Sequence, residues 1–158
     1  MDQIITAAGT VILNNDAILL VKEHGKWGLP KGGQEPNESL INTAVRETRE
    51  ETGLDVLIKG LAFMSEFFIE HWGHYLQVYY EAKPAGGKLN HIKDFEVDYA
   101  EYIPLDNIEE YLHFPPVINP LKAWLKDRQS SYYLSYLNED GKQVPPNDVQ
   151  WDKNNFKG

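Results

Sequence analysis

The sequence contains no cysteine among its 158 residues, which excludes disulfide frameworks, thiolate zinc sites, iron–sulfur clusters and cysteine nucleophiles. A metal ion can therefore be held only by oxygen or imidazole ligands. Basic residues are also scarce, because 15 Lys and Arg stand against 24 Asp and Glu and give a formal net charge of -9. Binding along a nucleic-acid backbone depends on neutralising phosphates, so a long nucleic acid is not an expected partner.

Long apolar runs are missing as well. The densest runs, 9–13 and 17–21, have the length of strands, whereas a membrane-spanning helix needs roughly 20 consecutive apolar residues. The first residues also lack the basic region and apolar region of a secretory signal. We therefore expect a cytoplasmic protein without a membrane span. Its length and its 42% hydrophobic residues are typical of one domain with a substantial core.

The N-terminal part of the chain combines strand patterns, a loop and a helix. Two β-branched and aliphatic runs separated by Asn-Asn-Asp predict a hairpin over 4–21. The next segment, 22–36, is rich in Gly and Pro and predicts an ordered loop. Apolar residues at spacings of three and four then predict a helix over 37–52, which Gly53 would end.

The following part of the chain again alternates between strand and helix patterns. Runs rich in apolar and aromatic residues predict three further strands, over 56–68, 75–83 and 96–104. A turn is expected over 84–87, and helical spacing predicts a second helix over 117–128. Strands around at least two helices indicate an α+β fold.

The last thirty residues are more polar than the rest, which divides the chain into a domain over 1–128 and an extension over 129–158. Within the extension, Asp140-Gly141 lies between two strand-like runs, as in a hairpin. The five aromatic residues of the extension either cap the core or form a contact between subunits, as in a homodimer. The alternative is a partly ordered chain terminus.

Glutamates gather near the end of the first predicted helix. Glu47, Glu50 and Glu51 share one helical face, because residues three and four apart project together. Their like charges repel, and Arg46 and Arg49 relieve the repulsion only in part. The residues alone leave two interpretations: a solvated acidic face, or a site for a hard divalent cation, which prefers carboxylate oxygens.

A longer pattern contains these glutamates. It runs Gly-x5-Glu-x7-Arg-Glu-x2-Glu-Glu-x-Gly-Leu from Gly32 to Leu54 and resembles the Nudix box, the signature of the Nudix hydrolase family. Thr48 stands where the family usually has an aliphatic residue, but its shape is close to that of valine, so the chemistry should be unaffected. The resemblance extends to Trp-Gly-Leu-Pro-Lys before the box and to 96–106 after it. It implies the Nudix α/β/α sandwich, with a mixed β-sheet between helices.

The resemblance also implies an activity. It indicates a pyrophosphohydrolase that depends on Mg²⁺ or Mn²⁺ and cleaves a nucleoside diphosphate linked to another moiety, by water attack on phosphorus. Candidate small-molecule substrates are dNTPs, oxidised dNTPs, ADP-ribose and sugar nucleotides. Two alternatives stay open: a nucleotide-binding regulator with little turnover, and a pyrophosphohydrolase of RNA 5′ ends, which the acidic charge disfavours.

The same resemblance implies the metal ligands. They are Glu47, Glu50 and Glu51 together with the backbone carbonyl of Lys31, and Glu50 and Glu51 are also catalytic candidates. The side chain of Lys31 is a separate matter, because it either approaches phosphate or remains a solvated loop lysine.

Arg46 has a supporting role in the family pattern. It is expected to pair with signature glutamates, including Glu38, and to assist catalysis by orienting the metal-binding face. The alternatives are an exposed partner for Glu50, and a Glu38 that interacts with the helix dipole. Gly32 and Gly53 fit a tight loop and a helix end.

The general base is drawn either from the signature or from a distal loop in this family. Glu96, six residues before Tyr102, is the distal candidate for base or metal ligand, with Asp98 and Glu101 as competitors. The alternative for all three acids is an acidic surface turn.

Candidates for substrate binding are mostly aromatic. Trp27 and Phe114 are able to stack on a nucleobase, although such residues are also typical of cores and solvated loops. The same two interpretations apply to His71, Trp72, His74, Tyr75 and His113. Phe-Pro-Pro from Phe114 resembles a base-reading segment of family members that act on oxidised nucleotides. Those members carry an Asn where this chain has Ile118, and Asn119 stands one position later.

Overall fold

The computed structural model describes residues 3–137 and 150–151. Its elements, in chain order, are β1 (Ile4–Asn14), β2 (Ala17–Glu23), β3 (Lys26–Gly28), β4 (Lys31–Gly33), α1 (Leu40–Thr52), β5 (Leu54–Ile69), β6 (Gly73–Gly87), β7 (Val97–Pro104), the 3-10 helix η1 (Leu105–Asn107), α2 (Ile108–Tyr111), α3 (Pro115–Lys126), β8 (Tyr132–Ser135) and β9 (Gln150–Trp151). None of the helices in this part of the chain is long and apolar enough to cross a membrane.

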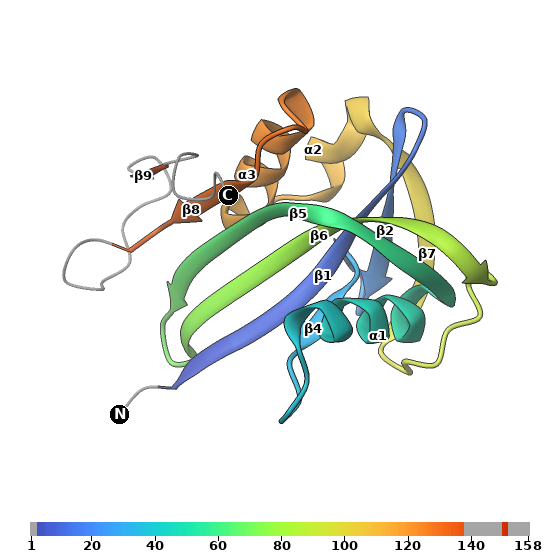
Figure 1. The fold of residues 1–158 in the computed structure, drawn as a ribbon, viewed down its shortest axis with the longest axis horizontal. Coiled ribbons are helices and arrows are strands. Elements are labelled where there is room, and N and C mark those ends of the chain that lie inside the picture. The colour runs from blue at the N-terminus through green and yellow to red at the C-terminus, as the bar shows by residue number, and fades with distance from the viewer. Residues whose placement is uncertain (1–2, 138–149, 152–158) are drawn as a thin grey trace.

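The strands form one mixed sheet in the order β3-β2-β1-β6-β5-β8-β9, with β4 beside β1 and β7 beside β2. β1 runs parallel to β6, and β6 pairs along its length with antiparallel β5. β2 pairs with β1 only next to their turn, whereas it pairs with β7 along its whole length. The sheet therefore divides into two arms, which Figure 1 shows on either side of β1.

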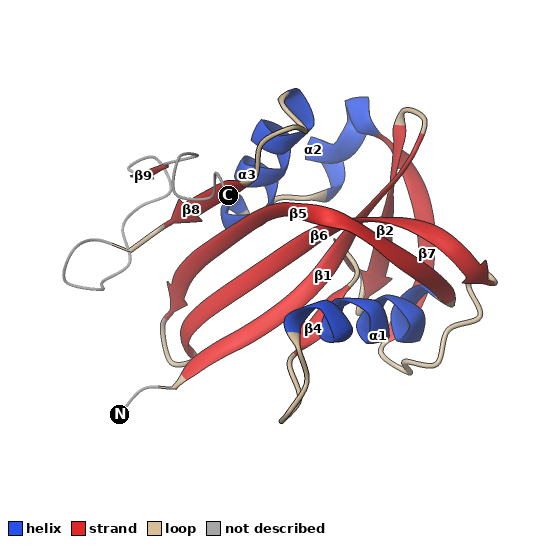
Figure 2. Ribbon diagram, in the orientation of Figure 1, coloured by secondary structure: helices blue, strands red, loops and turns tan. Residues whose placement is uncertain are grey.

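Six successive residues of β1, from Ala7 to Ile12, are buried. Because alternate residues of a strand point to opposite sides, both faces of β1 are covered. Val11 belongs to a core cluster that includes residues of α2 and α3, whereas Ile12 belongs to a second cluster against which Val45 of α1 packs. Figure 2 shows α1 on one side of the sheet and α2 and α3 on the other. The layers are helix, sheet and helix, which confirms the α/β/α sandwich of the α+β class.

α1 corresponds to the helix predicted over 37–52, but it begins at Leu40. Ser39 is the N-cap, and its hydroxyl accepts a backbone N–H of the first turn at 3.1 Å. Gly53 ends the helix with a φ of 84°, a left-handed conformation that glycine adopts without a steric penalty. The capping residues therefore fix both ends, and the predicted end at Gly53 is confirmed.

Most of the other predicted elements are also confirmed. β1 and β2 form the hairpin expected over 4–21, and the strands expected over 56–68, 75–83 and 96–104 correspond to β5, β6 and β7. The second predicted helix corresponds to α3, which begins at Pro115, because proline is well tolerated in a first helical turn.

Two sequence predictions need correction. The loop expected over 22–36 contains the short strands β3 and β4, because backbone groups in this segment pair with β2 and β1. The turn expected over 84–87 is instead the end of β6, which pairs with the beginning of β5. The pairing of β6 with β1 ends at Ala82, so Pro84 lies beside a free edge, where a residue without an N–H is tolerated.

β8 adds a parallel strand to the far edge of β5. Tyr132, Leu134 and Tyr136 are buried there, so these residues of the extension cap the core, as one of the interpretations held. The hairpin turn expected at 140–141 lies outside the described residues. The division of the chain at residue 128 stays a prediction.

Candidate active site

A buried polar pair fixes the rotation of α1 against the sheet. Thr48 of α1 and Thr10 of β1 are fully buried, and their hydroxyl oxygens are 2.7 Å apart. The threonine that departs from the family pattern therefore has a hydrogen-bond partner as well as a packing role. When Thr48 faces β1, the carboxylates of Glu47 and Glu51 lie next to β4.

The Glu51 side chain is buried where α1 meets β4. The residue is 4% exposed, and its Oε1 accepts the backbone N–H of Lys31 at 2.8 Å. Burial raises the pKa of Glu51 to about 8, although the Lys31 N–H acts in the opposite direction. This hydrogen bond brings the backbone of Lys31 against the predicted ligand Glu51, while the role of the Lys31 carbonyl stays a prediction.

β4 approaches α1 so closely that a side chain does not fit at Gly32. A Cβ added there would lie 2.0 Å from the carboxylate carbon of Glu47. Burial raises the pKa of Glu47, and its hydrogen bond with Arg46 partly offsets that shift. The space that the glycine leaves is therefore filled by the carboxylate of Glu47, whose side chain is 13% exposed.

Arg46 holds acids from two segments. It donates to both carboxylate oxygens of Glu38, at 2.8 and 3.0 Å, and to Glu47 at 2.8 Å. Its guanidinium also donates to the carbonyl of Gly33 at 3.0 Å. The hydrogen bonds from Arg46 lower the pKa of Glu38 to about 2, and the same pairing raises the pKa of Arg46. Arg46 thus lies between Glu38 and the metal-ligand candidate Glu47.

Glu50 lies on the more exposed side of this cluster. Its carboxylate is 3.3 Å from the guanidinium of Arg46. Its backbone carbonyl accepts the N–H groups of Lys93 and Asp94, at 3.0 and 3.2 Å. The structure therefore brings Glu50 into contact with Arg46 and with the loop before β7, and its role as a metal ligand stays a prediction.

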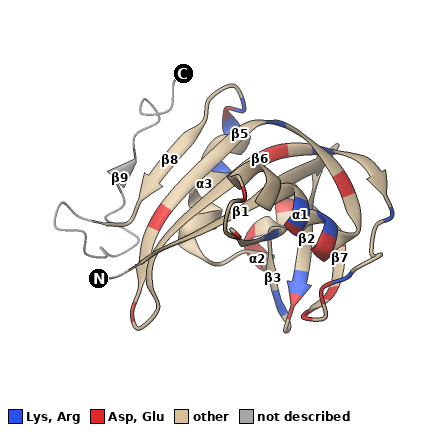
Figure 3. Cartoon of the chain, turned by 60° about the horizontal axis from the view of Figure 1, so that its bottom comes forward, with Lys and Arg blue, Asp and Glu red and all other residues tan. Residues whose placement is uncertain are grey.

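A loop residue completes a compact group of carboxylates. Glu47, Glu51 and Asp94 each have a carboxylate oxygen within 4.8 Å of the others. Figure 3 shows acidic and basic positions close together on α1. Sequence reasoning missed Asp94, and the available signal was its place in a short acidic stretch, two residues before Glu96. Three carboxylates this close repel one another unless a proton or a cation neutralises them.

Glu96 belongs to a second group, with Glu23 and His24. Nε2 of His24 and Oε2 of Glu96 are 4.0 Å apart. Burial raises the pKa of Glu23, and the charges of Asp94 and Glu96 add to the shift, so the two carboxylate groups are neighbours. The competing candidates Asp98 and Glu101 are exposed on β7 and belong to neither group.

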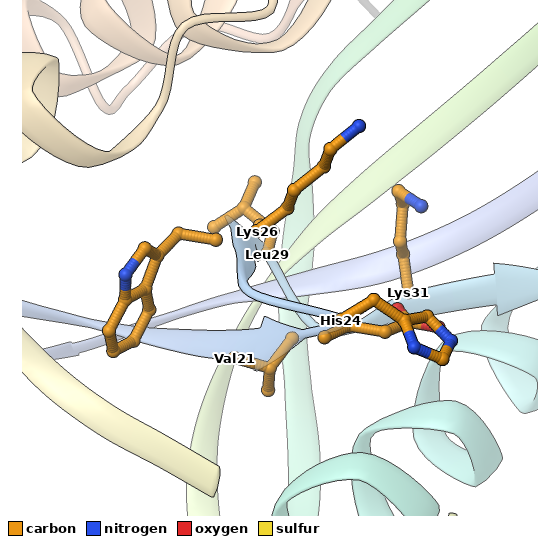
Figure 4. A pocket seen from close by; sticks show the side chains of 8 residues that line it. Val21, His24, Lys26, Leu29 and Lys31 are labelled. Carbon is orange, nitrogen blue, oxygen red and sulfur yellow. The ribbon is translucent and has the colours of Figure 1, made fainter. Parts of the chain in front are cut away.

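The second group borders a hollow of about 360 Å³. It is lined by Val21, Glu23, His24, Lys26, Trp27, Gly28, Leu29 and Lys31. In Figure 4 the side chains of Lys26 and Lys31 extend to the same side of the ribbon, with His24 below them. The hollow therefore combines acidic and basic side chains beside the carboxylates of α1.

Trp27 lines this hollow and also a second one of about 570 Å³. The indole ring has edge contacts with Tyr99 and Tyr111, at centroid distances of 5.5 and 5.1 Å. His113 and Phe114 line the second hollow together with Trp27. The structure thus brings the predicted substrate-binding residues Trp27 and Phe114 to one cleft.

The other candidates for substrate binding lie elsewhere. Asn119 donates to the hydroxyl of Tyr136 at 3.0 Å and does not line either of these hollows. Tyr75 stacks on Phe67, and His74 pairs with Glu66 at 2.8 Å. Sequence patterns identified aromatic and polar side chains but not the side of the sheet to which each one points.

Comparison with known proteins agrees with this geometry. The family model described as NUDIX domain matches residues 4–127. The protein named 8-oxo-dGDP phosphatase NUDT18 in Homo sapiens is 30% identical over 132 residues, which are 79% of this chain and 40% of that protein. Its Mus musculus counterpart is 33% identical over 90 residues, 53% of this chain and 27% of that protein. The chain therefore spans less than half the length of these curated relatives.

A solved structure shows the same fold. The NUDIX hydrolase from Nitrosomonas europaea superposes with a TM-score of 0.71 at 22% sequence identity, covering 96% of this chain and 99% of that chain. At this identity the likeness concerns the arrangement of helices and strands.

Proposed function

Because this chain belongs to the NUDIX domain family, we propose that it is a divalent-metal-dependent pyrophosphohydrolase acting on a nucleoside diphosphate derivative. One observation carries the proposal: Glu47, Glu51 and Asp94 gather within 4.8 Å, and Lys31, whose backbone N–H bonds to Glu51, lines a pocket together with Trp27 and Phe114. Carboxylates suit a hard cation, and aromatic rings suit a nucleobase.

The donor atoms fit Mg²⁺ or Mn²⁺, because all of them are oxygens. Glu47 and Glu51 of α1 and Asp94 of the loop would hold the ion, and Glu50, Glu96 and the Lys31 carbonyl are further proposed ligands. The close approach of β4 to the Glu47 carboxylate supports this assignment, because only a glycine at position 32 leaves space for that carboxylate. When bound, such an ion polarises a phosphoryl oxygen and lowers the pKa of a water molecule.

The other residues of the cluster orient these acids and supply charge. Arg46 fixes the Glu47 carboxylate by a hydrogen bond of 2.8 Å. Lys26 and Lys31 place two cations in the smaller hollow, where they would attract the phosphates of a substrate. Glu96, beside Glu23 and His24, is proposed either as a metal ligand or, in its place, as the base that takes the proton of the attacking water.

The nucleoside would occupy the larger hollow, between Trp27 and Phe114. Stacking on these rings contributes affinity without selecting one base strongly. The NUDT18 relatives are named 8-oxo-dGDP phosphatases, which makes 8-oxo-dGDP the first substrate to test on this chain. Asn119 donates a hydrogen bond to Tyr136, and we do not propose it as a residue that binds the nucleobase.

The test is a substrate panel with Mg²⁺ or Mn²⁺, analysed by chromatography of the products. The panel comprises 8-oxo-dGDP, dGDP, a dNTP, ADP-ribose, a sugar nucleotide and a capped RNA. We expect metal-dependent release of a nucleoside monophosphate from at least one small nucleotide. Tight binding of a nucleotide with no metal-dependent product would contradict the proposal and indicate a regulator.

A pair of matched variants connects the activity to the cluster. Glu51→Gln should reduce turnover by more than about a hundredfold, because changes to residues that merely support ligands already cost 10- to 100-fold. Glu70→Gln makes the same chemical change at an exposed turn, where the side chain is 86% exposed, and should leave turnover unchanged. Equal turnover in the two variants would remove Glu51 from the proposed site.

A further inference from the structure

The loop before β7 is fastened to the C-terminal end of α1. The last carbonyls of a helix lack partners within the helix, and here loop N–H groups supply them. Lys93 and Asp94 donate to the Glu50 carbonyl, Asn90 donates to the Thr52 carbonyl at 2.8 Å, and Lys88 donates to the Gly53 carbonyl at 3.1 Å. The helix that carries two carboxylates of the cluster thus holds the loop that carries the third.

The contact between helix end and loop is direct backbone packing. A Cβ added at Gly53 would lie 2.2 Å from the carbonyl oxygen of Lys88 and 2.7 Å from the backbone nitrogen of His91. The glycine therefore serves two purposes, because it ends α1 with a positive φ and lets the loop approach.

Asn90 connects this loop to a third element. Its side-chain amide donates to the carbonyl of Ala100 in β7 at 3.1 Å, and its side-chain oxygen accepts the N–H of Ala100 at 2.7 Å. Its own φ is 70°, a left-handed conformation that asparagine tolerates better than most residues. One residue therefore joins the end of α1, through its backbone N–H, to β7, through its side chain.

We propose that Asn90 is a positioning residue that holds Asp94 against Glu47 and Glu51 and so sets the affinity of this chain for a divalent cation. The inference rests on the proposed function. Asp94 lies four residues after Asn90, and its backbone N–H reaches the Glu50 carbonyl. Between them, the Asn90 anchor and the Glu50 anchor fix both ends of the short segment that places the Asp94 carboxylate.

The test compares Asn90→Gly with Asn15→Gly in the full chain. Glycine accepts a positive φ at both positions, so each variant removes an asparagine side chain without creating backbone strain. Asn15, with a φ of 55°, lies in the turn between β1 and β2 and serves as the control. If the Asn90→Gly chain does not fold, Asn90→Ser is used in its place. This variant keeps a hydroxyl group next to Ala100.

Binding of Mn²⁺ is measured without nucleotide, by electron paramagnetic resonance of the free ion, and the Mn²⁺ dependence of turnover is measured separately. We expect Asn90→Gly to weaken binding about tenfold, the lower end of the range for residues that support metal ligands. Turnover at saturating Mn²⁺ should fall much less than turnover at low Mn²⁺. Asn15→Gly should bind as the wild type does, and equal affinities of the two glycine variants would overturn the inference.

A double variant separates positioning from general stability. If Asn90 acts through Asp94, adding Asn90→Gly to Asp94→Asn should weaken Mn²⁺ binding no further. A full additional tenfold loss would show that Asn90 acts by another route and would overturn the inference. Failure of the wild-type chain to bind Mn²⁺ would instead refute the proposed function and this inference together, whereas wild-type binding with no effect of Asn90→Gly refutes the inference alone.

Discussion

The buried carboxyl of Glu51 makes folding and proton binding depend on each other. Burial raises its pKa from an ordinary value of 4.5 to about 8 in the folded chain. Between these two pH values the folded state binds more protons than the unfolded state, so the free energy of unfolding falls as the pH rises. Below about 4.5 and above about 8, this group adds no pH dependence.

We therefore expect the metal-free chain, in the presence of a chelator, to melt at a lower temperature at pH 8 than at pH 5. In Glu51→Gln this part of the pH dependence should disappear, while Glu70→Gln should retain it. Thermal unfolding at a series of pH values measures the difference. An identical slope in the Glu51→Gln chain would mean that Glu51 is not the group responsible.

A substitution at Gly32 tests the space reserved for Glu47. Gly32→Ala would place a Cβ 2.0 Å from the Glu47 carboxylate carbon, so that carboxylate must move. We expect metal-dependent turnover to fall more than about tenfold in a chain that still folds, since changes to groups that orient metal ligands typically cost about 10- to 100-fold. The matched control is Gly33→Ala, where no atom lies within 4 Å of the added Cβ. Similar turnover in the two alanine variants would show that the Glu47 position is not critical.

Individual site residues differed in how far the sequence could predict them. Glu47 and Glu51 lie on one helical turn, so the helix period alone places them together. Asp94 meets them through the packing of a loop on a helix end, an approach that no local periodicity encodes. Asn119 is the opposite case: its place in the sequence suggested contact with a nucleobase, but in the fold it donates to Tyr136.

At the level of elements, the Thr10 and Thr48 pair links β1 to α1. Thr48→Val should leave the buried Thr10 hydroxyl without its partner and lower the free energy of unfolding by about 1–3 kcal/mol. Replacing both threonines by valine removes both hydroxyls and should restore most of the loss. Urea unfolding of the single and double variants measures this, and equal stability of the wild type and the single variant would contradict it.

The elements that the sequence predicted well are those with a repeating pattern and a capping residue. α1 has apolar spacing, a serine N-cap and a glycine at its end, all of which are local signals. β3 and β4 are three residues each, and only their pairing with β2 and β1 makes them strands. The end of β6 was mistaken for a turn because proline and glycine are common in turns, whereas its pairing with β5 depends on a distant segment.

At the scale of the whole molecule, the burial of β8 residues leads us to expect a folding unit that extends beyond residue 128. A chain truncated after residue 128 lacks Tyr132 and Tyr136, which are 4% and 0% exposed. Losing one large buried aromatic side chain typically costs about 3–5 kcal/mol, so we expect a much lower melting temperature than for a chain that ends after residue 137. Calorimetry of both truncations measures it, and equal stability would support the domain boundary at residue 128.

The parallel pairing of β1 with β6 also sets an order of events in time. Ile4 pairs with His74, so the first strand must wait for about seventy further residues before its partner exists. At ribosomal rates of roughly 5–20 residues per second, that delay lasts about 4–14 s. During this interval Val11 and Ile12, which are fully buried in the folded chain, belong to an incomplete sheet, so the nascent N-terminal hairpin exposes apolar surface.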